Sequence, residues 1–154
     1  MTKRKVFFSF NYKDDNWRVQ QIKNIGAIEG QTILNSNQWE EVKARGDTAI
    51  KNWIDNSMSG RSCVVVLIGS NTAERKWVKY EINKALEDRK GLFGINIHNL
   101  EDRYGARSIQ GENPFKNYRG FKVYNPPANT PYIHIRDNIE DWIEQSLERA
   151  RNRT

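Results

Sequence analysis

Trp77 and Glu81 are the two side chains of this sequence whose types and spacing best suit chemistry. Four residues of an α-helix turn through about 400°, so the two side chains lie one above the other on the same helix face. A carboxylate beside an aromatic ring can hold ligand hydroxyls and can stabilise a positive charge that develops during a reaction. The alternative is an exposed glutamate that forms a surface pair with Arg75 or Lys84, and spacing alone favours that alternative.

The other reactive residue types indicate no second site. The sequence has no glycine-rich phosphate loop after a strand, no paired cysteines and no histidine pair at metal-ligand spacing. His98 and His134 stand alone, and we expect them at the surface or at strand ends. Cys63 lies in an apolar segment, which predicts a buried, unreactive thiol. We therefore expect no bound metal.

Five short segments have the pattern of β-strands. The clearest is 62–68, which is apolar on both faces, as expected for an inner strand of a parallel sheet that helices cover on both sides. The other expected strands are 5–10, 31–35, 92–97 and a fifth that is either 121–124 or 132–135.

Helical patterns separate these strands. The first expected helix begins after Asp14 or Asp15 and stops near Gly26, and the second follows Asp47 as its N-cap. The third covers 78–86 with Gly91 as C-cap, and the last is started by Asp137 or Asn138. In the third helix the apolar stripe is centred on Val78, Ile82 and Ala85, so Glu81 borders it.

Strands that alternate with helices predict an α/β fold with right-handed crossovers. For five strands we expect a flavodoxin-like parallel sheet in the order 2-1-3-4-5, with helices on both faces. Ligands of such sheets bind beyond the carboxyl ends of the strands. That edge would bring together residues 8–11 after the first strand, residues 69–72 after the third, and the helix that carries Trp77 and Glu81.

Length and charge restrict the possible functions. With 154 residues, the chain is expected to form one domain over 1–154. The net charge of +6 is concentrated in residues 1–5 and 147–154, which leaves the body of the domain nearly neutral. This distribution predicts an ordinary solvated surface with basic, flexible ends at about 1–4 and 150–154, and it argues against a nucleic-acid partner.

No segment of the sequence suggests a membrane or an export signal. The longest apolar run, 63–68, is far shorter than the ~20 residues that a membrane span needs. The apolar stretch after the basic start is too short for a signal peptide. The one cysteine allows no internal disulfide, which suits a reducing cytoplasm, where we expect the protein.

Two motifs resemble those of TIR domains. The segment GSNTAERKWVKYEINKAL, residues 69–86, resembles the TIR box in which a serine-rich loop precedes Trp-x-x-x-Glu. The start KVFFSFNYKDD resembles the first-strand box, with Phe10 in place of its tyrosine and Asp14 or Asp15 in place of its aspartate. Residues 57–69 and the Asn-Pro-Phe at 113–115 also fit. Over about 5–147, the chain most resembles the compact TIR-like family of bacterial Thoeris anti-phage systems.

This resemblance implies an enzyme that cleaves NAD⁺ at the nicotinamide–ribose bond and makes an ADP-ribose signal, often a cyclic one. NAD⁺ would be the substrate, with no further cofactor. By position, Glu81 matches the catalytic glutamate and Trp77 matches the aromatic residue that flanks the nicotinamide ribose. The first-strand residues that match the pocket wall are Phe7, Ser9, Phe10 and Asn11. One carboxylate suffices for this chemistry, because departing nicotinamide leaves an oxocarbenium-like ribose that needs a negative charge.

The resemblance also implies partners: a separate effector protein reached through the nucleotide product, a phage-derived trigger and self-association. Residues 39–46 fall where TIR domains have the loop after the second strand, and the long segment 99–131 is a candidate cover for the site. Two alternatives remain. One is a non-enzymatic TIR interaction module, and the other is a receiver-like or nucleotide-binding domain of the same topology, although the first strand lacks the paired acids of a receiver's metal site.

Overall fold

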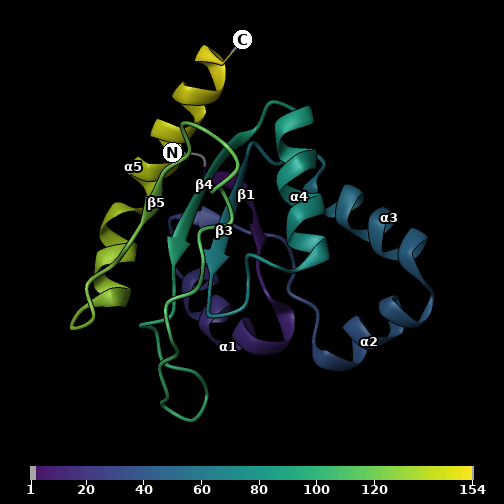
Figure 1. The fold of residues 1–154 in the computed structure, drawn as a ribbon, viewed down its shortest axis with the longest axis horizontal. Coiled ribbons are helices and arrows are strands. Elements are labelled where there is room, and N and C mark those ends of the chain that lie inside the picture. The colour runs from purple at the N-terminus through teal and green to yellow at the C-terminus, as the bar shows by residue number, and fades with distance from the viewer. Residues whose placement is uncertain (1–2, 154) are drawn as a thin grey trace.

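The chain folds around a five-stranded parallel sheet (Figure 1). The computed structural model describes residues 3–153. The strands are β1 (Arg4–Ser9), β2 (Ile28–Glu29), β3 (Cys63–Ile68), β4 (Gly91–Asn96) and β5 (Val123–Tyr124). They lie in the order β2-β1-β3-β4-β5 and all neighbours pair in parallel, so the predicted fold class and strand order are confirmed. Every residue of β3 and β4 is buried, as expected for inner strands.

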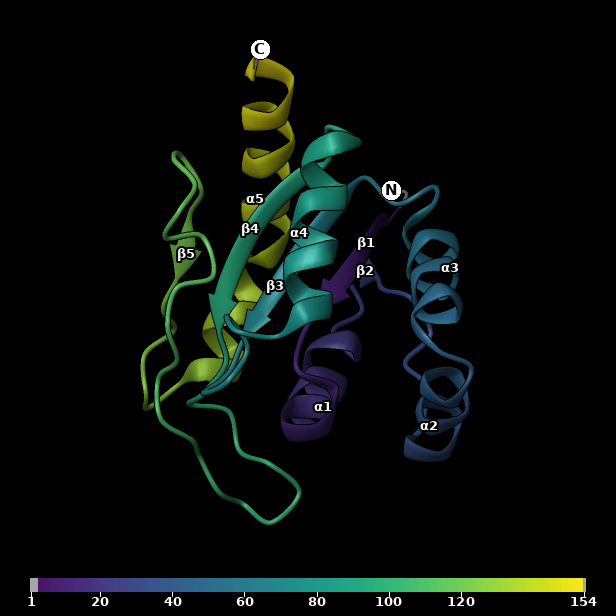
Figure 2. The same ribbon diagram turned by 45° about the vertical axis from the view of Figure 1, so that its right-hand side comes forward.

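Helices cover both faces of this sheet (Figure 2). The helices are α1 (Tyr12–Lys23), α2 (Ser36–Ala44), α3 (Asp47–Met58), α4 (Lys76–Glu87) and α5 (Pro131–Asn152). α1 and α5 pack on one face, and α3 and α4 pack on the other, with α2 beside α3. No helix within residues 3–153 has the length and the apolar character that crossing a bilayer requires.

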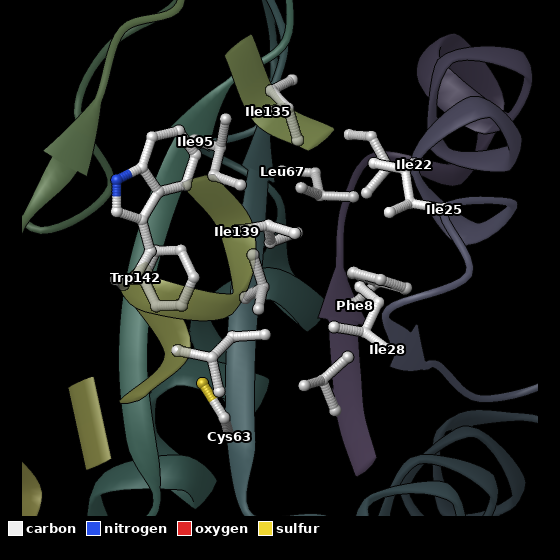
Figure 3. Packing of buried hydrophobic residues seen from close by; sticks show 14 of the residues in the cluster. Phe8, Ile22, Ile25, Ile28, Cys63, Leu67, Ile95, Ile135, Ile139 and Trp142 are labelled. Carbon is white, nitrogen blue, oxygen red and sulfur yellow. The ribbon is translucent and has the colours of Figure 1, made fainter. Parts of the chain in front are cut away.

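Each face of the sheet has its own apolar core. Figure 3 shows the cluster beneath α1 and α5, where Ile22 and Ile139 approach Phe8 and Leu67 from the two helices. Trp142 closes this cluster at the β5 edge by stacking on Tyr124, with ring centroids 4.2 Å apart. The second cluster lies beneath α3 and α4. Alternation along β1 explains the division, because Val6 and Phe8 face the first cluster while Phe7 faces the second.

The second strand and the segment after it differ from the prediction. The expected strand at 31–35 is wrong: β2 comprises Ile28–Glu29, and no strand forms at 31–35. The segment 39–46, expected to be a loop, is largely the helix α2. A capping box at Asn35 and Gln38 starts this helix, since each of the two side chains accepts a hydrogen bond from the other residue's backbone N–H at 2.9 Å.

Three helix boundaries also differ. α1 begins at Tyr12, before the predicted start after Asp14 or Asp15, because the Asn11 side chain caps it. Asp47 is the first residue of α3, whose N-cap is Gly46. Gly91 begins β4 and is not a C-cap, since α4 ends at Glu87 and Arg89 takes the left-handed conformation with φ 56°.

The C-terminal part of the structure decides between the two positions expected for the fifth strand. β5 falls within 121–124, while 132–135 belong to α5, which begins at Pro131 and not at Asp137 or Asn138. Proline at the first helical position suits a helix start. The ends expected to be flexible are partly regular: Arg4 begins β1 and pairs with Glu144 at 2.8 Å, and α5 continues to Asn152. Residues 1, 2 and 154 lie outside the described residues.

Candidate active site

Glu81 is buried and its carboxylate is held by Ser9. The Ser9 hydroxyl donates a hydrogen bond of 2.6 Å to Glu81 Oε1. Ser9 shares the face of β1 that Phe7 presents to α4, and Glu81 lies on the buried side of α4 with only 7% of its surface exposed. The alternative of a solvated surface pair is therefore wrong. Lys84 instead pairs with Asp88 at 3.2 Å.

Burial changes the acid–base behaviour of Glu81. Removal from water raises the pKa of its carboxyl to about 8, because the charged form loses hydration, while the hydrogen bond from Ser9 acts in the opposite direction. No basic side chain pairs with Glu81 among the described residues. Perturbed carboxyl groups of this kind are characteristic of functional sites.

Glu81 forms part of the wall of a pocket that is mostly aromatic, with about 540 Å³ of empty space when its open mouth is included. The residues that line the pocket are Phe7, Phe8, Phe10, Tyr12, Gln31, Ile33, Trp39, Trp53, Arg75, Trp77, Val78 and Glu81. A carboxylate on an aromatic wall offers a negative charge to a cationic ligand while the rings exclude water.

The aromatic rings support one another around this pocket. Phe10 stacks on Tyr12 and Tyr12 stacks on Trp39, each with centroids 5.4 Å apart, and Trp39 meets Trp53 edge to face at 6.0 Å. Trp77 packs edge to face on a neighbouring tyrosine of α4. Phe10 directly follows β1 and the other rings come from α1, α2, α3 and α4, so residues distant in sequence line one pocket.

The structure separates the four predicted wall residues by role. Phe7 and Phe10 line the pocket beside Trp77 and Glu81. Ser9 lies outside the lining, where it holds the Glu81 carboxylate. Asn11 is 3% exposed and caps α1, accepting a hydrogen bond from the backbone N–H of Asp14, and it does not line the pocket. The binding roles of these residues remain predictions.

Gln31 was missed by the sequence analysis, although it shapes the pocket. Its carboxamide accepts a hydrogen bond from the Phe8 backbone N–H at 2.9 Å and donates one to the Phe8 carbonyl at 2.8 Å. The side chain thus pairs with β1 as a strand residue would, just beyond the end of β2. Gly30 permits this close approach, because a Cβ there would lie 2.4 Å from the Phe8 ring.

The sequence also does not predict a place in the pocket lining for Tyr12, Ile33, Trp39, Trp53, Arg75 and Val78. A usable signal existed for Trp39, since Asn35-x-x-Gln38 is a helix-start signature and places this tryptophan in the first turn of a helix. The contact of Trp39 with Tyr12 depends on packing between α1 and α2, which no local pattern reveals.

The isolated reactive residues lie apart from this pocket. Cys63 is fully buried, as predicted, and burial raises the pKa of its thiol to about 12, which disfavours the reactive thiolate. His98 follows the carboxyl end of β4, and His134 lies within α5. Residues 3–153 contain no group of three or more acidic, histidine or cysteine side chains that could hold a metal ion. The absence of a cofactor requirement stays a prediction.

Comparison with known proteins identifies the family. Residues 7–102 match the family described as "Thoeris protein ThsB, TIR-like domain", which is more than half of the chain. This chain belongs to the ThsB family of TIR-like domains. The matched range contains the end of β1 and all of β3 and α4, so it includes both Ser9 and Glu81 of this TIR-like domain.

A curated relative of this TIR-like domain comes from Bacillus cereus (strain MSX-D12). It is named "Putative cyclic ADP-D-ribose synthase ThsB1" and is 36% identical over 124 residues, which is 77% of this chain. The match covers 64% of the relative's own length.

Proposed function

We propose that this TIR-like domain cleaves NAD⁺ between nicotinamide and ribose and closes the ADP-ribose into a cyclic product. The observation that carries the proposal is the buried carboxylate of Glu81, hydrogen-bonded by Ser9 on the wall of an aromatic pocket. The name of the Bacillus cereus relative and the membership of the Thoeris family support it. NAD⁺ would be consumed as a substrate.

In the proposed reaction, the bond between the ribose carbon and the ring nitrogen breaks, and its electron pair leaves with neutral nicotinamide. Glu81 then faces the oxocarbenium-like ribose, whose positive charge its carboxylate stabilises. The nicotinamide ring of NAD⁺ is itself cationic, so substrate binding lowers the pKa of Glu81 and favours the charged form. The aromatic wall restricts water, so that a nucleophilic atom of the same molecule's ADP-ribose can donate its lone pair to the cationic ribose carbon instead, and the proton that this ring closure frees is released to solvent.

The product would act as a signal on a separate effector protein during phage defence. NAD⁺, this effector and a phage-derived trigger are the partners that the proposal names, and self-association is compatible with it.

Release of free nicotinamide from NAD⁺ tests the proposal. The purified chain should release nicotinamide, alone or after addition of extract from phage-infected cells, and Glu81→Gln should release it about a hundredfold or more slower under either condition. Equal release by the two proteins would contradict the assignment of Glu81. No release under either condition, from chain shown to be folded, would favour the interaction module instead.

A further inference from the structure

A polar groove adjoins the aromatic pocket on the side of α1. Its walls come from α1, α2, the segment after β3 and the loop around 102–108, and they surround about 1650 Å³ of space that includes the open side. Tyr12, Trp39 and Arg75 line both the groove and the aromatic pocket. The two hollows therefore border each other at these three side chains.

Positive charge predominates in the groove. Four basic side chains of its walls have no ion pair among the described residues: Lys13, Arg75, Arg103 and Arg107. All four residues are exposed, so a ligand in the groove can reach them. Arginine donors suit phosphate oxygens well, because the planar guanidinium can donate two parallel hydrogen bonds.

The acidic groups of the groove already have partners. Asp14 accepts hydrogen bonds from the side-chain amides of two asparagines, at 3.0 and 3.3 Å. Asp102 accepts from two backbone N–H groups of its own loop, both at 2.9 Å. Glu40 lies 3.0 Å from Lys43. Only Glu40 is thus balanced by a cation, while Asp14 and Asp102 keep their charge, so four unpaired basic side chains face two unpaired carboxylates and positive charge still predominates.

The loop wall of the groove is anchored to the body of the domain. Arg18 is 4% exposed and donates to the carbonyls of Leu100 at 2.7 Å and Ala106 at 3.0 Å, while an aspartate of α1 balances its charge. Where the loop returns, Gly111 lies so close to Gly69 that a Cβ would be 2.1 Å from the Gly69 carbonyl oxygen. Figure 2 shows this loop extending past the carboxyl ends of β3 and β4, next to α1.

Arg75 occupies the junction of the two hollows. It is the N-cap residue of α4, two positions before Trp77 and six before Glu81, and no side chain caps the helix there. An anion at this point would interact with the guanidinium and with the positive end of the α4 dipole. In a dinucleotide, one ribose separates the phosphates from the nicotinamide. This order fits a ribose at Glu81, the phosphates at Arg75 and the rest of the molecule in the groove.

We propose that the groove binds the phosphate-bearing half of a dinucleotide, with Arg75 on the diphosphate and Arg107 within the groove. This inference rests on the proposed function, because it takes the nicotinamide ribose to lie at Glu81. It assigns a ligand class to the groove and a binding role to Arg75 and Arg107. It also gives the segment 99–131 a role in substrate binding rather than only as a cover.

Calorimetric binding of ADP-ribose tests the groove without requiring turnover. The unmodified chain should bind ADP-ribose, and Arg75→Gln and Arg107→Gln should each weaken binding about tenfold or more, as expected for a lost charge-assisted hydrogen bond. Arg119→Gln is the matched control, since Arg119 is exposed and lies outside both hollows. Nicotinamide riboside, which has no phosphate, should bind the arginine variants as tightly as the unmodified chain.

Turnover separates this inference from the proposed function. In both arginine variants the KM for NAD⁺ should rise about tenfold while kcat stays within about twofold. An unchanged KM, equal ADP-ribose binding by all variants, or no binding by the unmodified chain would overturn the groove assignment even if NAD⁺ is cleaved. Arginine-dependent ADP-ribose binding by a chain that never cleaves NAD⁺ would support the groove and overturn the proposed function.

Discussion

The proton on Glu81 links the burial of this residue to its proposed chemistry. With the pKa of its carboxyl near 8, the free protein holds the neutral form at lower pH, whereas an oxocarbenium-like ribose needs the carboxylate. We therefore expect kcat/KM for NAD⁺ to rise with pH up to about 8 and then level, because this parameter reports the free protein. Ser9→Ala removes the hydrogen bond that lowers the pKa, so it should move this rise to higher pH. A pH profile measured by nicotinamide release checks both expectations, and a flat profile would contradict them.

Glu81→Gln should change stability as well as turnover. Because the folded-state pKa of Glu81 is raised, its protonation stabilises the fold fully below about 4.5, and this contribution is lost as the pH rises to about 8. Glutamine does not titrate, so only the unmodified chain loses this contribution. The melting temperature of Glu81→Gln minus that of the unmodified chain should therefore increase from pH 5 to pH 9. Turnover should fall by about two to three orders of magnitude.

Glu87→Gln is the matched control for this change, since Glu87 is an exposed residue at the end of the same helix. It should leave both turnover and the pH dependence of the melting temperature unchanged. A Glu81→Gln protein whose melting temperature follows that of the unmodified chain at every pH would show that Glu81 is ionised throughout.

Helical spacing was enough to select Glu81 and Trp77 as a pair, but it could not show that Glu81 is buried. That burial depends on Ser9, which is 72 positions away and reaches the carboxylate only because β1 and α4 pack together. Similarly, the stack of Tyr12 on Trp39 is a contact between helices, and local patterns contain no information about it.

At the scale of elements, the brevity of β2 makes one side chain important for the sheet. Gln31 satisfies both the N–H and the carbonyl of Phe8, which strand pairing would otherwise satisfy. Gln31→Leu would leave two buried backbone groups without partners, so the free energy of unfolding should fall by about 2–5 kcal/mol. Urea unfolding measures this loss. Gln110→Leu, the same change at an exposed loop position, should cost under about 0.5 kcal/mol, and equal losses for the two variants would contradict the role of Gln31.

Elements with a long repeating pattern were predicted well, and short or capped ones were not. β3 is apolar throughout and α4 has a clear helical stripe, so both were found within a few residues of their bounds. β2 has two residues, which is too few for any periodicity. The start of α5 was placed too late because its first turn, from Pro131, is only partly apolar and resembles a strand.

At the scale of the whole molecule, the proposed site joins elements from both halves of the sequence. Ser9, Trp39 and Glu81 come from β1, α2 and α4, while the groove beside them is closed by the loop after β4. Both hollows are open to solvent, so a small nucleotide product can leave without unfolding of any element. This openness suits a protein whose product acts elsewhere. It leads to a prediction about cells.

A protein-free filtrate should carry the signal. Filtrate from phage-infected cells that express this chain should activate a candidate effector added separately, because a cyclic ADP-ribose passes a membrane that retains proteins. Filtrate from cells that express Glu81→Gln should be inactive, and that from cells with Glu87→Gln should be as active as that from the unmodified chain. The effector's own activity, measured with and without filtrate, provides the readout. If activation requires the intact chain and never follows from filtrate, the chain acts by direct contact, and the proposal of a diffusible product is wrong.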